Sequence, residues 1–342
     1  MDMNIFTAFL TLPFANGISD NILYQLLIFI ISVIILAKAS HIVIKNSVKL
    51  ARITKLGELV IGFILLSVAT SLPELAVSFS AITSGNVGIS IGNLLGSNVA
   101  NLGLVIAIPA MMTPLVIGWG TFRKLPSILF LCSIIPLLFL TMSEMSSIIG
   151  GMLILAFIFF AGYSMKKKIS LKLVSKEPKN ILKKLFMPFE FYKACFLLCI
   201  GLLILLISSS FVVSSASNIS SIAGVAESVI GATVIAIGTS LPELSVALTA
   251  IKTRHHKMAI GNTIGSCLTN ITLILGIVLI FSPAAINIQI FSTLLLFVIG
   301  ITMVAWYFFT TERRLDRTEG MILLFIYIVF LISTFGVQIT II

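Results

Sequence analysis

Two nearly identical stretches constrain this chain more than any other feature. The residues Thr70–Leu75, TSLPEL, return as Thr239–Leu244 at an offset of 169 residues. At the same offset, and without a gap, the pattern Gly-Asn-x-x-Gly-Ser-x-x-x-Asn of residues 92–101 returns at residues 261–270. A repeat of this kind means that one structural unit is used twice. The sequence therefore predicts two related halves.

Each copy places a glutamate directly after a proline inside a long apolar run, as Pro73-Glu74 and Pro242-Glu243. An ionisable residue at membrane depth is costly and indicates a functional site. Proline lacks a backbone N–H and disturbs the preceding helical turn, so it frees carbonyl groups. The carbonyls freed here are expected near Ala69, Thr70, Ala236 and Gly238. Broken helices at matching positions of two halves predict a transporter site near the bilayer midplane.

Composition assigns the chain to the polytopic membrane proteins. Of its 342 residues 58% are hydrophobic and 10% are charged, and the mean hydropathy is +1.18, which excludes a soluble globular domain. Apolar runs of suitable length predict an all-α protein with ten transmembrane helices. These are expected at about 22–44, 57–83, 87–112, 125–142, 147–165, 190–213, 226–251, 257–281, 290–310 and 320–341.

The basic residues predict the orientation of these helices. All 22 lysines and arginines fall at the odd-numbered connections between the predicted helices. By the positive-inside rule those connections lie in the cytoplasm and both termini lie outside. The net charge of +10 is thus topogenic, and no nucleic-acid partner is expected. Because each half has an odd number of helices, the second half crosses the membrane in the opposite orientation to the first. Equivalent positions are therefore basic in only one half: Lys45 and Lys49 correspond to Ser214 and Asn218, whereas Gly88 corresponds to Lys257.

The chain therefore divides into two inverted five-helix repeats joined by a basic linker. The expected boundaries are 1–165 for the first repeat, 166–189 for the cytoplasmic linker and 190–342 for the second repeat, with ion-site motifs at 58–103 and 227–276. The linker is interpreted as topogenic charge that could also contact anionic lipid headgroups. The sequence does not indicate an oligomeric state.

The polar groups of the two motifs are almost all oxygen ligands. Beside the two glutamates stand the hydroxyl and amide residues Thr70, Ser71, Ser97, Asn101, Thr239, Ser240, Ser266 and Asn270. The spacing of four places the serine and the asparagine of each motif on one helical face. Hard cations such as Ca²⁺ prefer such ligands. Asn93 and Asn262 could serve either ligation or helix packing.

Softer metals are not expected to bind at this site. Zinc or copper would require imidazole or thiolate groups, and no histidine reaches the predicted membrane core. The four cysteines show no metal-binding spacing and are interpreted as buried packing residues. They are Cys132, Cys195, Cys199 and Cys267.

The duplicated motif resembles the two alpha repeats of the sodium/calcium exchanger family, of prokaryotic type, within the calcium/cation antiporter superfamily. The resemblance implies an antiporter of ten helices, whose second, third, seventh and eighth helices form the ion sites. It implies ion ligands at Thr70, Ser71, Glu74, Ser97, Asn101, Thr239, Ser240, Glu243, Ser266 and Asn270, with backbone carbonyls of Ser67 and Ala236.

Two positions depart from the family pattern. Cys267 replaces the asparagine that Asn98 keeps in the first copy, and it is interpreted as a neighbour of the site. Asn270 stands where some members, including potassium-dependent ones, carry aspartate. The neutral Asn270 therefore predicts transport without K⁺.

The leading hypothesis is a secondary antiporter in the cell membrane that extrudes Ca²⁺ against Na⁺ by alternating access and moves net charge. Two carboxylates balance one Ca²⁺ or two Na⁺, and neutral oxygens could hold a third Na⁺. An H⁺/Ca²⁺ exchanger is the main alternative, because protonating carboxylates would also serve it. A cation channel is a third hypothesis. An enzyme is not expected, since no catalytic constellation is visible, and neither is a cofactor.

Overall fold

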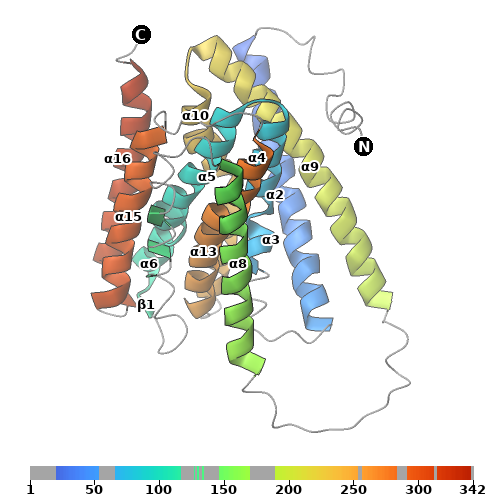
Figure 1. Cartoon of the computed structure of the whole chain (residues 1–342), viewed down its shortest axis with the longest axis vertical. Coiled ribbons are helices and arrows are strands. Elements are labelled where there is room, and N and C mark those ends of the chain that lie inside the picture. The colour runs from blue at the N-terminus through green and yellow to red at the C-terminus, as the bar shows by residue number, and fades with distance from the viewer. Residues whose placement is uncertain are drawn as a thin grey trace.

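The computed structural model describes residues 21–53, 66–116, 127, 129–130, 133–134, 146–169, 189–252, 256–282, 291–311 and 314–339. Over these residues the protein is helical apart from one two-stranded sheet (Figure 1). In the first half the elements are α2 (Ile22–Ile53), α3 (Leu66–Thr70), α4 (Leu72–Thr83), α5 (Val87–Ala100), η2 (Asn101–Val105), α6 (Ala107–Met112), β1 (Leu115–Val116) and α8 (Ser146–Ile169). In the second half they are α9 (Phe189–Ala223), α10 (Glu227–Ile230), η7 (Gly231–Ile235), α11 (Ala236–Thr239), α12 (Leu241–Lys252), α13 (His256–Thr269), η8 (Asn270–Ile274), α14 (Leu275–Phe281), α15 (Ser292–Thr311), β2 (Arg314–Leu315) and α16 (Arg317–Ile339).

Among the described residues, seven helical runs are long and apolar enough to cross a membrane. They are Ile22–Asn46, Val87–Met112, Phe189–Ala223, Glu227–Lys252, Met258–Phe281, Ser292–Thr310 and Arg317–Gly336, with shorter apolar helices at Leu72–Thr83 and Ser147–Gly162. The first residues of the helix expected at 57–83 lie outside the described residues. Most of the helix expected at 125–142 lies outside them too. The basic linker also lies mostly outside them. The count of ten helices stays a prediction.

Several of the connections that the basic residues mark as cytoplasmic lie at one end of the molecule. In Figure 1 the first end of α2 and the last end of α16 lie at the top, whereas α8 ends and α9 begins at the bottom. Also at the bottom, β1 pairs antiparallel with β2, with Leu115 opposite Leu315. An ion pair between Lys49 of α2 and Glu190 of α9 joins the end of α2 to the connection between α8 and α9. Which side faces the cytoplasm stays a prediction.

The backbone of α5 packs directly against the backbone of the second half. A Cβ atom on Gly92 would lie 2.4 Å from the carbonyl oxygen of Ser228, and one on Gly96 would lie 2.1 Å from that of Ala232. No side chain fits at either position, so glycine is required there for α5 to contact α10 and η7. This packing brings the first motif against the second.

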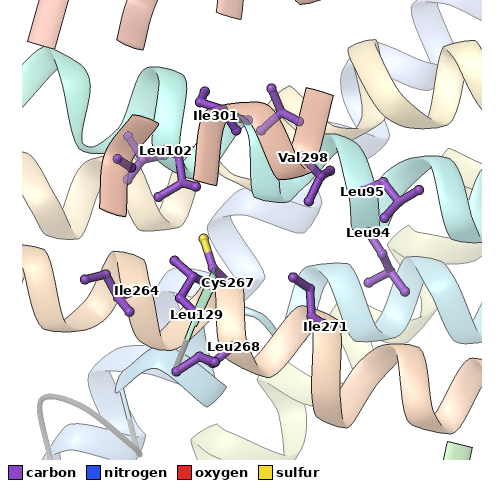
Figure 2. Packing of buried hydrophobic residues seen from close by; sticks show 14 of the residues in the cluster. Leu94, Leu95, Leu102, Leu129, Ile264, Cys267, Leu268, Ile271, Val298 and Ile301 are labelled. Atoms are coloured by element: carbon purple, nitrogen blue, oxygen red, sulfur yellow. The ribbon is translucent and has the colours of Figure 1, made fainter. Parts of the chain in front are cut away.

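An apolar cluster surrounds the end of α5. Figure 2 shows Leu94, Leu95 and Leu102 from α5 and η2, Val298 and Ile301 from α15, and residues of α13 and η8 such as Ile264, Leu268 and Ile271. These side chains exclude water from the region beside the two motifs. Both α5 and α13 are buried over most of their lengths.

The expectation that all cysteines are buried was wrong for two of them. Cys267 is buried, but Cys195 is half-buried and Cys199 is exposed. Both lie on α9, of which only a third is buried over its most apolar stretch, so much of this helix is left exposed, as expected of a helix that faces lipid. A thiol is apolar enough to be tolerated there. Cys132 lies outside the described residues.

Candidate cation site

Two helix breaks stand at the centre of the site. In the first copy α3 ends at Thr70 and α4 begins at Leu72, and in the second copy α11 ends at Thr239 and α12 begins at Leu241. Ser71 and Ser240 occupy the breaks. The proline that follows lies in the first turn of the next helix, where its missing N–H needs no partner. The breaks predicted from the prolines are thus confirmed, but the Ala236 carbonyl is not freed, because it accepts from the Ser240 N–H at 3.1 Å.

Short π-helical segments mark the next helix of each copy, and the sequence did not predict them. The segment η2 begins at Asn101 and η8 begins at Asn270, so they start at equivalent positions of the repeat. A third segment, η7, immediately precedes α11. Such segments widen a turn and shift the backbone hydrogen-bond pattern, and they are frequent at functional sites. Here each of the two begins at the asparagine of its motif, and a helix follows it.

The structure buries all twelve residues that the sequence named as cation ligands. The largest exposed fraction among the twelve side chains is 2%, at Ser67, and both glutamates are fully buried. The twelve residues come from four places: the break after α3, the break after α11, the helix α5 with η2, and the helix α13 with η8. They form a polar centre between the two halves.

Each glutamate is contacted by the serine of the other copy. The Ser71 hydroxyl lies 3.5 Å from Oε1 of Glu243, and the Ser240 hydroxyl lies 3.5 Å from Oε1 of Glu74. Ser266, from the same copy as Glu243, donates to that carboxylate at 3.4 Å. Each motif therefore supplies a hydroxyl group to the carboxylate of the other motif.

The threonines directly before these two serines also contact the opposite copy. The Thr70 hydroxyl lies 3.1 Å from that of Ser266, and the Ser97 hydroxyl lies 3.3 Å from that of Thr239. Each threonine also donates to a backbone carbonyl of its own copy, Thr70 to Ser67 at 3.2 Å and Thr239 to Ala236 at 3.3 Å. These two carbonyls therefore face the same cluster of hydroxyls.

Two further asparagines, for which the sequence allowed either ligation or helix packing, belong to the site. Oδ1 of Asn93 accepts from Thr239 at 3.1 Å, and Oδ1 of Asn262 accepts from Thr70 at 3.4 Å. Both are fully buried. The signal for them was present, since they recur at the same offset between glycines, but the sequence could not show that they contact the opposite copy.

Several buried polar atoms of the site have no hydrogen-bond partner among the described residues. They include Oε2 of Glu74, Oε2 of Glu243 and Oδ1 of Asn270. Two carboxylates buried side by side are costly unless a positive charge compensates them. The site also contains no group of three His, Cys, Asp or Glu residues close enough to hold a metal, within the ranges that the structure describes. The available ligands are therefore mixed oxygens, which suit hard cations.

The two copies also meet at the last asparagine of each motif. Nδ2 of Asn270 donates to Oδ1 of Asn98 at 3.2 Å. At the place equivalent to Asn98 the second copy has Cys267, which is fully buried and directly follows Ser266 in the chain.

Comparison with known proteins agrees with this geometry. The family model "sodium/calcium exchanger protein" matches residues 24–166 and 193–336. The chain is 29% identical to the sodium/calcium exchanger MaX1 of Methanosarcina acetivorans, with 90% of this chain and 98% of that protein covered. It is 30% identical to the putative antiporter CaxA of Alkalimonas amylolytica, over 82% of this chain and 88% of the relative. A structure of the sodium-calcium exchanger NCX_Mj soaked with Na⁺ superimposes with a TM-score of 0.63 at 28% identity, covering 90% of this chain and 98% of that one.

Proposed function

Because this chain belongs to the sodium/calcium exchanger family, we propose that it is a secondary antiporter that exchanges Na⁺ for Ca²⁺ by alternating access. It is a multi-pass membrane protein, and its relatives include an inner membrane protein of Escherichia coli. The observation that carries the proposal is the pair of fully buried glutamates, each contacted by a serine of the other copy. A pair of negative charges in a water-poor centre suits one divalent cation or two monovalent ones.

We assign the cation ligands to the residues of this centre. They are Glu74, Glu243, Ser71, Ser240, Thr70, Thr239, Ser97, Ser266, Asn101 and Asn270, with the carbonyls of Ser67 and Ala236. The carbonyl of Ser67 already accepts from the Ser71 N–H at 3.0 Å and from Thr70. We propose that Thr70 releases it when a cation binds, because the same hydroxyl also reaches Ser266. Thr239 has the matching choice between Ala236 and Asn93.

The same assignment predicts charge movement. Either one Ca²⁺ or two Na⁺ balance the two glutamates, and the neutral hydroxyls and carbonyls offer ligands for a third Na⁺. Exchange of three Na⁺ for one Ca²⁺ moves one net charge, which couples transport to the membrane potential by about 2.3 kcal/mol per 100 mV. Asn270 is neutral and adds no anion for K⁺. We therefore propose electrogenic, K⁺-independent exchange.

Flux measurements test this function against its alternatives. Vesicles that contain the protein and are loaded with Na⁺ should take up Ca²⁺ when diluted into Na⁺-free medium, faster when the potential favours the exit of positive charge. Replacement of external K⁺ by choline should leave the rate unchanged. Uptake driven by a pH gradient alone would instead indicate an H⁺/Ca²⁺ exchanger, and non-saturating flux without any counter-ion would indicate a channel.

We also propose ten helices in two inverted halves with both termini outside. The shared side of the odd-numbered connections and the position of the basic residues support this orientation. A cysteine introduced at Ser175 in the linker of a variant without other cysteines should resist an impermeant maleimide added to intact cells. The same cysteine should react after the cells are opened. Labelling in intact cells would contradict the orientation.

A further inference from the structure

One face of α2 is exposed over most of the helix, and its chemistry changes along the way. In the first half of α2 this face is apolar and includes Ile31 and Ile34, which are each about half exposed. The same face continues with Lys38, His41 and Lys45, all of them exposed. Steps of three and four residues place these side chains in line with the apolar ones. Lys38, His41 and Lys45 thus form a basic stripe.

The basic stripe begins within the depth of the membrane. Val33 of α2 lies against Gly238, where an added Cβ atom would lie 3.0 Å from the Cγ1 atom of Val33. Gly238 directly precedes Thr239 of the cation site, and transporter sites of this kind lie near the bilayer midplane. Lys38 follows Val33 by five residues, which is about 7.5 Å along a helix. Half of the hydrocarbon core is about 15 Å thick, so the backbone of Lys38 lies inside it.

The neighbouring helix α9 is apolar at the same level. Gly201 of α9 packs against Val43 of α2, and the two helices run in opposite directions (Figure 1). The exposed side chains of α9 just beyond Gly201, such as Leu203 and Ile207, therefore lie level with Lys38. Lys38 is thus a cation among exposed apolar side chains.

The basic stripe has no acidic partner in the part of the chain that the structure describes. The helix α2 contains no aspartate or glutamate, and the Glu190 carboxylate at its end is paired with Lys49. Neither Lys38 nor Lys45 forms an ion pair with another described residue. A lysine at this depth is costly unless its ammonium group reaches the headgroup level or a negative charge meets it. The membrane itself can supply that charge.

We propose that the basic stripe binds the phosphate group of one anionic phospholipid, in the leaflet at the Lys49 end of α2. Lys45 contacts the phosphate from the aqueous side, Lys38 extends toward it from the apolar side, and a ring N–H of His41 donates to it between them. The acyl chains then run along Ile34. In the orientation proposed above this leaflet is the cytoplasmic one, where anionic lipids are enriched. The lipid site does not depend on which ions the protein exchanges.

Native mass spectrometry tests the site directly. Purified full-length protein in detergent is mixed with phosphatidylglycerol and phosphatidylcholine that carry the same acyl chains, and the lipids that stay bound are counted. One phosphatidylglycerol should stay bound per chain in preference to phosphatidylcholine. Lys38→Gln and Lys45→Gln should each lower the affinity for phosphatidylglycerol about fivefold, which corresponds to about 1 kcal/mol for a lysine near the membrane surface.

Matched variants separate position from charge. Lys193→Gln combined with Lys252→Gln removes the same charge from two exposed lysines outside the stripe and should leave the affinity nearly unchanged. Lys38→Arg combined with Lys45→Arg keeps the charge and should keep the affinity. Excess inorganic phosphate should not displace the lipid, because it has no acyl chains to cover the apolar part of the face.

Thermal unfolding in detergent provides a second measurement and shows whether the variants fold. Without added lipid, Lys38→Gln combined with Lys45→Gln should unfold at the same temperature as the unsubstituted protein, since both side chains are exposed. Phosphatidylglycerol should raise the unfolding temperature of the unsubstituted protein and of the Lys193 and Lys252 control, because a lipid that binds the folded state stabilises it. It should not raise that of the stripe variant.

Four results would overturn the lipid site. Equal losses of affinity in the stripe variant and in the control would show a general attraction to surface charge. Equal retention of phosphatidylcholine would show that no anion is selected, and displacement by inorganic phosphate would indicate a site for a free anion. Unchanged binding in Lys38→Gln would show that the deep end of the stripe takes no part. None of these results depends on transport, so the antiporter function stands or fails separately.

Discussion

The two copies of the motif are alike where they meet and different further out. At the centre Ser71 contacts Glu243 as Ser240 contacts Glu74, at the same distance. One turn beyond Glu74, Ser78 accepts a hydrogen bond from Nδ2 of Asn93 at 3.3 Å. The second copy has alanine at the equivalent position of α12, and Nδ2 of its asparagine has no partner among the described residues. This is the pattern that the proposed shared ion would require, since both copies would have to keep their contacts at the centre, whereas the residues further out contact only their own half.

Substitution of the glutamates tests whether the two copies are equivalent at the centre, and it should have the largest effect. Glu74→Gln and Glu243→Gln should each weaken Ca²⁺ exchange at least about 100-fold. Each removes one carboxylate from the proposed pairing with a buried Ca²⁺, and loss of one partner of a buried ion pair costs about 3–5 kcal/mol. Ca²⁺ uptake into Na⁺-loaded vesicles measures the loss. Glu227→Gln is the matched control, because that half-buried carboxylate binds Ser217 away from the centre and its loss should leave exchange intact. Near-normal exchange in both central variants would contradict the site.

A glycine substitution tests the packing that brings the copies together. Gly96→Ala should lower the free energy of unfolding by about 1–3 kcal/mol, because its methyl group overlaps the backbone of Ala232. Thermal unfolding in detergent measures this. Gly151→Ala on α8 has open space around the new methyl group and should change little. If the copies pack alike, Gly265→Ala should resemble Gly96→Ala, and a silent Gly96→Ala would refute the close contact.

The smallest expected effect concerns the difference between the flanks. Ser78→Ala should destabilise the protein by about 1 kcal/mol, because Asn93 loses an acceptor. Ala247→Ser places a hydroxyl at the equivalent site, where Nδ2 of Asn262 lacks a partner, and should stabilise the protein by a similar amount. Unfolding temperatures of both variants measure the pair. Equal signs for the two substitutions would show that the flanks do not differ in this way.

The sequence predicted the parts of the site that follow from cost and covalent structure. A glutamate in an apolar run and a proline beside it allow few alternatives, so the buried pair and the two helix breaks were predictable. The π-helical segments at Asn101 and Asn270 were not, because one widened turn leaves the pattern of apolar residues unchanged.

Other features depend on contacts between distant parts of the chain. No spacing could show that Asn93 contacts Thr239 of the opposite copy. The lipid-facing positions of Cys195 and Cys199 were also missed, because a lipid-facing side and a protein-facing side of a membrane helix are equally apolar. The antiparallel pairing of β1 with β2 likewise joins segments that the sequence does not relate.

The exchange of serines between the copies has a consequence for how such a chain could arise. Neither half holds a complete site, because the hydroxyl that completes each carboxylate belongs to the other half. A forerunner with a single copy would have had to assemble two chains around one ion. Fusion of the two genes would then have made that partnership permanent and left each copy free to change alone, as the cysteine at position 267 has done.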